Sequence, residues 1–267
     1  MAPGPESHPS GHCRPDPSVP PFAPQGRALV AAWEQLSRGR RADVAPLEVH
    51  DADGPGEPVS PTTFFREPDA FEDWERALLD ACTGRVLDVG AGAGAHALCL
   101  QRRGHAVTAL DVDPDCVRVM TARGVVDARC GTLADMDDGP FDTLLFAMHG
   151  IGLAGDLPGL HWLLAECWRL QAPGGVVLLD SRAPDTALDA AAAADLAAPY
   201  PGETELWMRH GPLTGAAFGW LFVDAATLTA VAARVQLSAT ITRCPPEQPD
   251  VPGRYLARLR RDDAGSD

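Results

Sequence analysis

The 267-residue sequence predicts an α/β fold in which helices cover both faces of a mostly parallel sheet. Between residues 85 and 180, short apolar runs alternate with segments whose apolar residues recur at helical spacing. A glycine-rich turn joins the first apolar run to the first helical segment. Strands buried on both faces are typically continuous apolar runs, and a regular alternation of strands and helices is typical of parallel sheets.

Each element of this alternation can be assigned in chain order. The expected strands are RVLDVG (85–90), AVTALD (106–111), VVDARC (125–130), DTLLFAM (142–148) and GVVLLD (175–180). The expected helices between them cover residues 95–104, 114–124 and 157–170. Later in the chain, a helix over 228–236 precedes two closing strands, SATITRC (238–244) and RYLARLR (254–260). The main domain is expected to cover residues 84–267.

The chain before this domain has a different composition. Residues 1–26 contain eight prolines and few large apolar side chains, which predicts a disordered tail. Residues 27–83 are expected to form an extension over the functional site. Within it we predict a short helix over 28–36, a Pro/Gly/Asp-rich loop over 42–63 and a second helix over 71–82.

One segment late in the chain lies outside the strand–helix alternation. TELWMRH (204–210) and AAFGWLFVD (216–224), joined by GPLTG, have the pattern of a β-hairpin. The segment is rich in aromatic residues: Trp207, Phe218, Trp220 and Phe222. We interpret residues 200–223 as a cap over the open end of the sheet, and an edge hairpin packed on the core is an equal alternative.

Composition excludes several function classes. The formal charge is −15, with 37 acidic residues against 22 arginines and no lysine, which disfavours a nucleic-acid partner. The seven cysteines are scattered singly, so neither a metal site nor a disulfide framework is indicated. No apolar run reaches the ~20 residues of a membrane span, and the first residues lack a secretory signal. We therefore expect a cytoplasmic protein.

The strongest functional signal is the turn after the first strand, in RVLDVGAGAGAH. Gly90, Gly92 and Gly94 alternate between a buried strand and a helix. Glycines at such a turn let the backbone bend tightly and let a ligand lie against it. The spacing alone also satisfies the fingerprint of dinucleotide-binding proteins.

Two acids near this turn separate the possible ligands. Asp111 ends the second strand, at the distance typical of a carboxylate that accepts hydrogen bonds from both ribose hydroxyls. Asp88 lies two residues before Gly90, where a carboxylate repels the pyrophosphate of NAD or FAD. A nucleoside cofactor without phosphate and with an ammonium group, S-adenosylmethionine, suits both acids. A capping carboxylate is the alternative interpretation of Asp88.

From Phe64 to Leu259 the chain resembles the class I S-adenosylmethionine-dependent methyltransferases. Val86–Gly94 matches their first motif, and Asp111 matches their ribose acid. A narrower resemblance, to a functionally uncharacterised bacterial group, rests on FFR at 64–66, GAGAGAHAL, FDTLL followed by GIGLAG, FGWLFVD and YLARL. The resemblance implies a Rossmann-like seven-stranded sheet with one antiparallel strand. It implies no particular methyl acceptor.

The resemblance also implies the residues of the cofactor site. They are Asp88, Gly90, Ala91, Gly92, Gly94, Asp111, Val112, Thr132, Leu133 and Met148. This chain departs from the family at Thr132, where many members carry an acid. Adenine binding is then expected to involve the backbone and side chain of Leu133, with Asp135 as a possible substitute acid.

The residues expected on the acceptor side are Phe65, Arg66, His149 and Asp180. His149 stands in the loop after the fourth strand, where the relatives carry Asn, and its ordinary pKa suits a general base. We favour a structural role for His149, because Asn cannot act as a base. Phe65 and Arg66 are expected to fold over the cofactor, although core packing and a surface salt bridge are the commoner outcomes.

The predicted function is methyl transfer from S-adenosylmethionine, with S-adenosylhomocysteine as product, to a small or medium-sized acceptor molecule. Two other classes remain open: an NAD(P)-dependent oxidoreductase, against which Asp88 counts, and a non-catalytic regulatory protein that binds S-adenosylmethionine. The sequence indicates neither the acceptor atom nor the oligomeric state.

Overall fold

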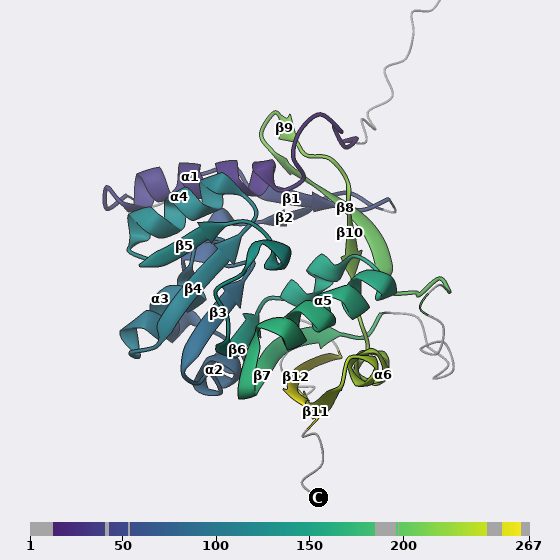
Figure 1. Ribbon diagram of the computed structural model, residues 1–267. Coiled ribbons are helices and arrows are strands. Elements are labelled where there is room, and N and C mark those ends of the chain that lie inside the picture. The colour runs from purple at the N-terminus through teal and green to yellow at the C-terminus, as the bar shows by residue number, and fades with distance from the viewer. Residues whose placement is uncertain are drawn as a thin grey trace, which may run out of the picture.

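The structure is a computed structural model that describes residues 13–40, 43–52, 54–184, 196, 198–244 and 253–262. A seven-stranded sheet lies at its centre, in the order β11–β12–β7–β6–β3–β4–β5 (Figure 1). These strands are β3 (Arg85–Val89), β4 (Ala106–Asp111), β5 (Asp127–Cys130), β6 (Phe141–Phe146), β7 (Gln171–Arg182), β11 (Leu237–Arg243) and β12 (Arg254–Arg261). All seven predicted strands of the main sheet are therefore present.

The direction of the strands agrees with the predicted fold class. β3 pairs in parallel with β4 and β6, β4 pairs in parallel with β5, and β6 pairs in parallel with β7. β12 is antiparallel to both of its neighbours, β7 and β11. The sheet thus has one reversed strand, and the carboxyl ends of β3, β4, β6 and β7 meet at one edge.

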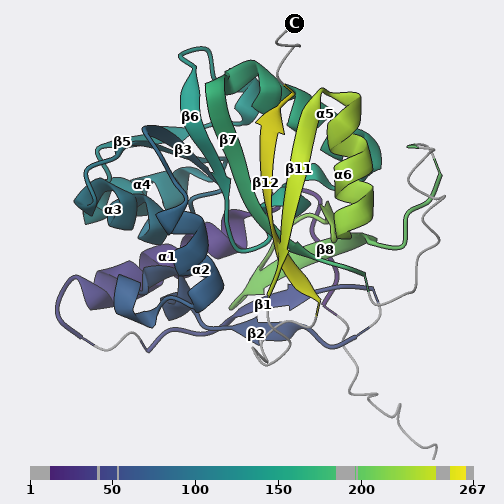
Figure 2. The ribbon, with the colours of Figure 1, turned by 90° about the horizontal axis from the view of Figure 1, so that it is seen from below.

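Helices cover both faces of this sheet (Figure 2). On one face lie α5 (Leu157–Leu170) and α6 (Ala225–Arg234), whose apolar residues pack in one core with Phe146, Val177 and Leu179. On the other face lie α2 (Asp73–Asp80), α3 (Ala95–Arg102) and α4 (Pro114–Arg123), packed in a second core with Val86 and Leu178. The continuous apolar runs of the sequence follow from this burial on two sides.

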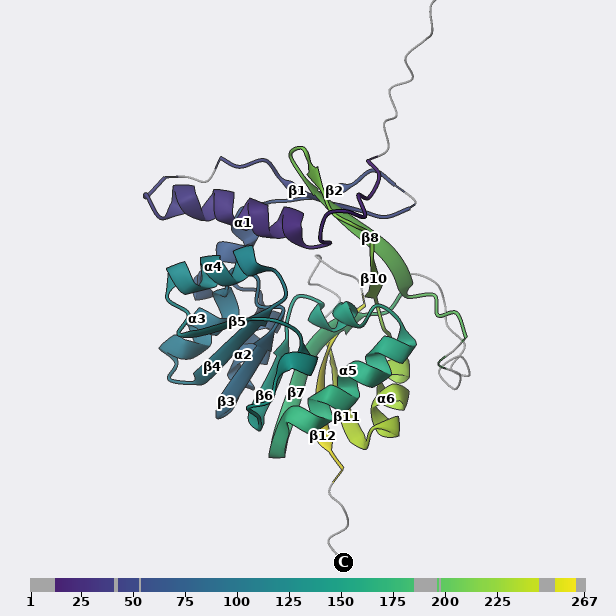
Figure 3. The same ribbon diagram turned by 45° about the horizontal axis from the view of Figure 1, so that its top comes forward.

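A second, antiparallel sheet lies across one end of the molecule together with α1 (Ala23–Leu36) (Figure 3). Its strand order is β10–β8–β1–β2, with β9 paired to β8. The strands are β1 (Leu47–His50), β2 (Glu57–Val59), β8 (Glu203–His210), β9 (Leu213–Thr214) and β10 (Phe218–Leu221). β8 and β10 pair as the predicted hairpin requires, and β10 contacts the loop that follows β6.

The prediction of a loop over residues 42–63 is wrong, because this segment contains β1, β2 and the 3-10 helix η1 (Pro61–Phe65). β1 pairs with β8, whose paired residues lie 157 to 163 positions later in the chain, and Leu47 packs with Ala28 and Met208. β2 is an edge strand, where Pro58 costs no ladder hydrogen bond. Strands this short take their stability from partners that the local sequence does not show.

The predicted disordered tail is also wrong in the part that the structure describes. Asp16 donates a backbone hydrogen bond to Gly215 (3.1 Å), and Ala216 donates one to Val19 (2.9 Å). α1 then begins at Ala23, with Pro24 in its first turn, where a missing N–H costs nothing. Residues 1–12 of the predicted tail lie outside the described residues.

Among the described residues, neither a candidate membrane-spanning helix nor a candidate metal-binding cluster is found. None of their helices is long and apolar enough to span a membrane. No group of three or more His, Cys, Asp or Glu side chains in that part of the chain is arranged to hold a metal ion.

Candidate functional site

The glycine turn after β3 requires its glycines. Gly90, Gly92 and Gly94 have φ of +72°, +56° and +77°, in the left-handed region that costs other residues roughly 1–2 kcal/mol each. The N–H groups of Gly90 and Ala91 both donate to the carbonyl of Leu110, at 2.9 and 3.1 Å. The turn is thereby attached to the end of β4.

Asp111 holds the same turn through its side chain. One carboxylate oxygen accepts from the N–H of Gly92 (2.8 Å) and the other from the N–H of Asp113 (2.9 Å). Burial raises the pKa of Asp111 to about 6, against the two backbone donors, which lower it. The next residue, Val112, is 47% exposed and presents an apolar surface beside the acid.

Asp88 is buried beneath the turn. It lies in β3 and is 2% exposed, and its Oδ2 has no hydrogen-bond partner among the described residues. Burial raises the pKa of Asp88 to about 6, opposed by His96 and by the backbone of Ala97. Asp88 accepts the backbone N–H of Ala97 in the first turn of α3, as the capping alternative expects, and its Oδ2 is in addition a buried acceptor with unused capacity.

The segment expected to meet adenine has a different geometry from the one predicted. Thr132 precedes the 3-10 helix η3 (Leu133–Asp135) and donates to Asp135 through both its N–H and its hydroxyl, each at 2.8 Å. Asp135 is thus used as a cap, and these hydrogen bonds lower its pKa. The Leu133 side chain is buried in the core, and its carbonyl accepts from Arg169 (3.1 Å). The Leu133 side chain therefore packs in the core, and its expected contact with adenine stays a prediction.

Two consecutive residues after β6 have a strained backbone. Met148 and His149 have φ of +57° and +59°, and the 3-10 helix η4 (Gly150–Ala154) follows. Non-glycine residues in this conformation cost of order 1–3 kcal/mol each, and such strain is concentrated at functional sites. His and Asn tolerate the left-handed region better than most residues, which explains how His149 can stand where relatives are expected to carry Asn.

His149 is fixed by two partners. The backbone N–H of His149 donates to Asp180 Oδ1 (3.0 Å), and the ring Nε2 accepts from Nη2 of Arg254 (3.1 Å). Nδ1 lies 3.3 Å from Asp180 Oδ2, but the two are not aligned for a hydrogen bond. Burial and, to a smaller extent, the charges of Arg254 and Arg182 together lower the pKa of His149 to about 3. The imidazole is therefore neutral, and the Nε2 lone pair that a general base needs already accepts the hydrogen bond from Arg254.

Asp180, which is buried, and Arg66, which is half-buried, both belong to charged networks. Asp180 is fully buried at the end of β7, and burial raises its pKa to about 6. Arg66 makes a bidentate ion pair with the buried Glu75 (2.7 and 2.8 Å), which also bonds His96 (3.0 Å). Arg66 therefore does not form the surface salt bridge considered above, and it reaches the sulfur of Met148 at 3.9 Å.

The N-terminal segment lies over the glycine turn. A β-carbon placed on Gly92 would lie 3.8 Å from Gln25 Nε2 and 3.9 Å from Phe64 Cδ1. Phe65 is stacked on Trp33 of α1, with ring centroids 6.3 Å apart, and Arg123 of α4 lies over its ring. Phe65 thus joins α1 to α4, while Phe64 lies close to the turn.

Three residues of this region, Trp74, Glu75 and Arg254, were not expected there from the sequence, and Phe222 was expected only as part of the aromatic cap. The four come from elements far apart in the chain. The one sequence signal for Arg254 was its position at the start of a predicted strand, because Arg254 begins β12 opposite the end of β7. Trp74 and Glu75 carried no signal beyond helical spacing.

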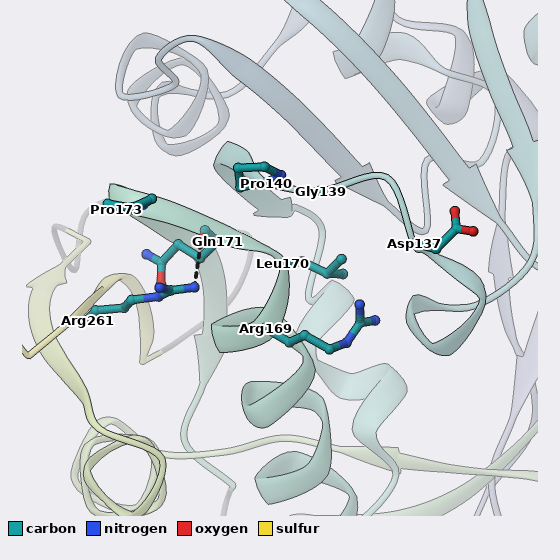
Figure 4. A pocket seen from close by; sticks show the side chains of 8 residues that line it. All are labelled: Asp137, Gly139, Pro140, Arg169, Leu170, Gln171, Pro173 and Arg261. Atoms are coloured by element: carbon teal, nitrogen blue, oxygen red, sulfur yellow. Dashed lines mark hydrogen bonds between the residues drawn. The ribbon is translucent and has the colours of Figure 1, made fainter.

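Two surface hollows lie elsewhere in the described part of the molecule. One of about 360 Å³ opens at the amino ends of β6 and β7, lined by Pro140, Gln171 and Arg261 among others (Figure 4). The other, of about 450 Å³, borders the amino ends of β3 and β4. Ligands of open α/β sheets bind outside the carboxyl ends of the strands, so neither hollow belongs to the candidate site.

Comparison with known proteins gives consistent results. A family model described as a methyltransferase domain matches residues 86–175. A solved S-adenosylmethionine-dependent methyltransferase from Bacteroides fragilis, in complex with S-adenosyl-L-homocysteine, is 32% identical. It superposes with a TM-score of 0.76 over 89% of this chain and 94% of that one.

Other relatives match less of the chain or match it less closely. The ubiquinone biosynthesis O-methyltransferase of Xanthomonas oryzae pv. oryzae is 32% identical over 139 residues, 49% of this chain and 54% of that protein. This chain therefore spans about half the length of the curated relatives it matches. The CcbJ methyltransferase from Streptomyces caelestis is 15% identical, with a TM-score of 0.51 over 72% of this chain and 94% of that one, and shows the fold alone.

The sheet with one reversed strand, together with a glycine turn bonded to the acid of the next strand, defines a nucleoside-binding α/β domain. The Bacteroides relative matches it over nearly the whole of both chains. The chain belongs to the class I S-adenosylmethionine-dependent methyltransferases, which confirms the resemblance seen in its motifs.

The residues present fit S-adenosylmethionine. A carboxylate has about four acceptor positions, and Asp111 uses two of them, so it can still accept from ribose hydroxyls. Asp88 Oδ2 is a buried acceptor without a partner, which suits a cationic ammonium group. A pyrophosphate in the same place would be repelled by this carboxylate.

The buried Asp88 generates a prediction on pH and stability. Its folded pKa, about 6, lies above the ordinary 3.8, so the folded state holds a proton that the unfolded state releases in this window. Stability from this group is therefore lost as the pH rises from about 4 to about 6. Asp88→Asn removes the titration. The free energy of unfolding of the variant, relative to that of the wild type, should therefore increase by roughly 1–3 kcal/mol from pH 4 to pH 7 in urea unfolding. A stability difference that is equal at both pH values would contradict the assignment.

Proposed function

We propose that this protein transfers the methyl group of S-adenosylmethionine to a small or medium-sized acceptor molecule. The observation that carries the proposal is the bond from Gly92 N–H to Asp111, which forms a nucleoside site at the carboxyl ends of β3 and β4. The S-adenosylhomocysteine in the Bacteroides relative supports the same activity.

The cofactor supplies an activated methyl group on a sulfonium. We assign Asp111 to the ribose hydroxyls, Asp88 to the ammonium group and Val112 to one face of the adenine. The remaining cofactor contacts are assigned to Gly90, Ala91, Gly92, Gly94, Thr132, the Leu133 backbone and Met148. The protein contributes chiefly by holding the two reactants in line, which supplies up to ~7–11 kcal/mol in favourable cases.

His149 is proposed to position the loop after β6 rather than to take a proton. Its pKa of about 3 and the hydrogen bond from Arg254 to Nε2 both argue against a base at this atom. The hydrogen bond from its backbone N–H to Asp180 fixes the strained turn that brings Met148 to the end of β6. Asp180 and Arg66 are proposed to act in the same way, as groups of charged networks that order the acceptor side.

The two competing functions differ from this proposal in measurable ways. An NAD(P)-dependent oxidoreductase needs a pyrophosphate beside the glycine turn, where Asp88 is buried. A regulatory protein would bind S-adenosylmethionine without converting it to S-adenosylhomocysteine. We also propose a cytoplasmic location and no nucleic-acid partner, supported by seven free cysteines and the charge of −15.

Binding measurements test the cofactor. Calorimetry is expected to show micromolar-range binding of S-adenosylhomocysteine and no comparable binding of NAD or NADP. Asp111→Ala removes a charged acceptor and should weaken S-adenosylhomocysteine binding by ~1.5–3 kcal/mol, whereas Asp80→Ala, at an exposed acid at the end of α2 that pairs with Arg103, should change it far less. Tight NAD binding without S-adenosylhomocysteine binding would overturn the proposal.

Exchange of His149 separates positioning from proton transfer. His149→Asn keeps a residue that tolerates the left-handed backbone but removes any base. It should retain most of the single-turnover methyl-transfer rate and the same pH profile, whereas His149→Leu should lose activity and stability together. A ~10²-fold or larger rate loss in the Asn variant, at unchanged cofactor affinity, would identify His149 as the base instead.

A further inference from the structure

The side chain of Gln25 lies over the glycine turn without a hydrogen-bond partner in the described part of the chain. Its Nε2 atom lies 3.8 Å from the position of a β-carbon placed on Gly92. Gln25 is half-buried, and no hydrogen bond joins its amide to another described residue. A primary amide offers two N–H donors and a carbonyl acceptor. The Gln25 amide is therefore available to a polar group that binds at the turn.

The helix that carries Gln25 is fixed against the same turn. Gln25 and Leu29 are four residues apart in α1, so they lie on one face of the helix. Leu29 packs in one apolar cluster with Ala93, which belongs to the glycine turn, and α1 lies along α4 (Figure 3). A β-carbon on Gly26 would clash with the Asp113 carboxylate, so α1 cannot slide along α4 without a clash. This packing directs Gln25 at the turn.

The turn itself has few donors left for a ligand. Four of its N–H groups already donate to acceptors within the protein, namely those of Gly90, Ala91, Gly92 and Gly94. Arg123, which contacts the turn from α4, donates to the carbonyl oxygens of Ala93 and Phe64. An anionic group that rests on the turn therefore depends on donors that other segments supply.

The cofactor brings an anionic group to this place. In S-adenosylmethionine the ammonium group, assigned above to Asp88, and the carboxylate are attached to the same carbon atom, so the carboxylate lies beside the turn. Asp88 and Asp111 repel it, and a neutral amide donor does not. We infer that the Gln25 amide donates to the carboxylate of S-adenosylmethionine, which makes α1 a part of the cofactor site. The inference rests on the proposed function, because it takes Asp88 as the ammonium site.

Two ligands with the same adenosine thioether test this role by calorimetry: S-adenosylhomocysteine, and methylthioadenosine, in which a methyl group replaces the amino-acid chain. Gln25→Ala should weaken S-adenosylhomocysteine binding about tenfold or more, because a hydrogen bond to a charged group is lost, and should leave methylthioadenosine binding within about twofold. Gln25→Glu keeps the shape but replaces the donors with a negative charge, so it should weaken S-adenosylhomocysteine binding further. The control is Gln35→Ala on the same helix, where the amide bonds Asp43, and both affinities should stay within about twofold.

An unchanged S-adenosylhomocysteine affinity in Gln25→Ala would overturn the inference and leave the proposed function standing. An equal loss for both ligands would also overturn it, because Gln25 would then only hold α1 in place. If the wild type does not bind S-adenosylhomocysteine, the proposed function fails and the inference fails with it. Thermal unfolding is measured on every variant, and if Gln25→Ala does not fold, the same comparison of the two ligands on Gln25→Glu decides the inference.

Discussion

The hydrogen bond from Gly92 N–H to the carboxylate of Asp111 connects most of the candidate site to the sheet. Through the other oxygen of this carboxylate, which accepts from Asp113 N–H, the same residue fixes the start of α4. Asp113 in turn caps α4 by accepting from Asp115 and Cys116. A β-carbon placed on Gly26 of α1 would lie 2.2 Å from the Asp113 carboxylate, so α1 packs directly on this cap. The turn, the acid, the cap and the covering helix form one continuous set of contacts.

The acceptor side is organised by a different constraint, the burial of charge. Asp180, Glu75 and Arg254 lie almost out of contact with water, where each ion needs a partner. Asp180 holds the backbone of His149 in its left-handed conformation, and Arg254 occupies the imidazole. These contacts make the region rigid and leave the chemistry to the activated cofactor and the acceptor, which is consistent with catalysis by positioning.

The sequence predicted the central sheet because its local signals and its tertiary environment agree. Runs such as VVLL (176–179) in β7 are apolar throughout because both faces are buried, and the glycines are needed where φ is positive. β1 and β2 were missed because strands of four and three residues, one of them with Pro58, take their stability from pairing, β1 with β8 and β2 with β1. The N-terminal prolines indicated disorder, yet the backbone of residues 16–19 bonds to residues 215–216, a partner that composition cannot reveal.

The site was predictable to a similar extent. Glycines and acids at fixed spacing revealed the nucleoside end, because they depend on one strand–turn–helix unit and the next strand. The acceptor end depends on β12 returning antiparallel beside β7, which brings Arg254 to His149 across 105 positions of sequence. The burial of the Leu133 side chain and the depressed pKa of His149 follow from packing of distant elements, which spacing does not encode.

The most direct test of this account is a crystal structure of the protein with S-adenosylhomocysteine. The account predicts that both ribose hydroxyls lie within hydrogen-bond distance of the Asp111 carboxylate while Gly92 N–H remains bonded to it, and that the ammonium group lies nearest Asp88. A nucleoside bound away from Asp111, or an Asp111 that has released the glycine turn, would contradict it.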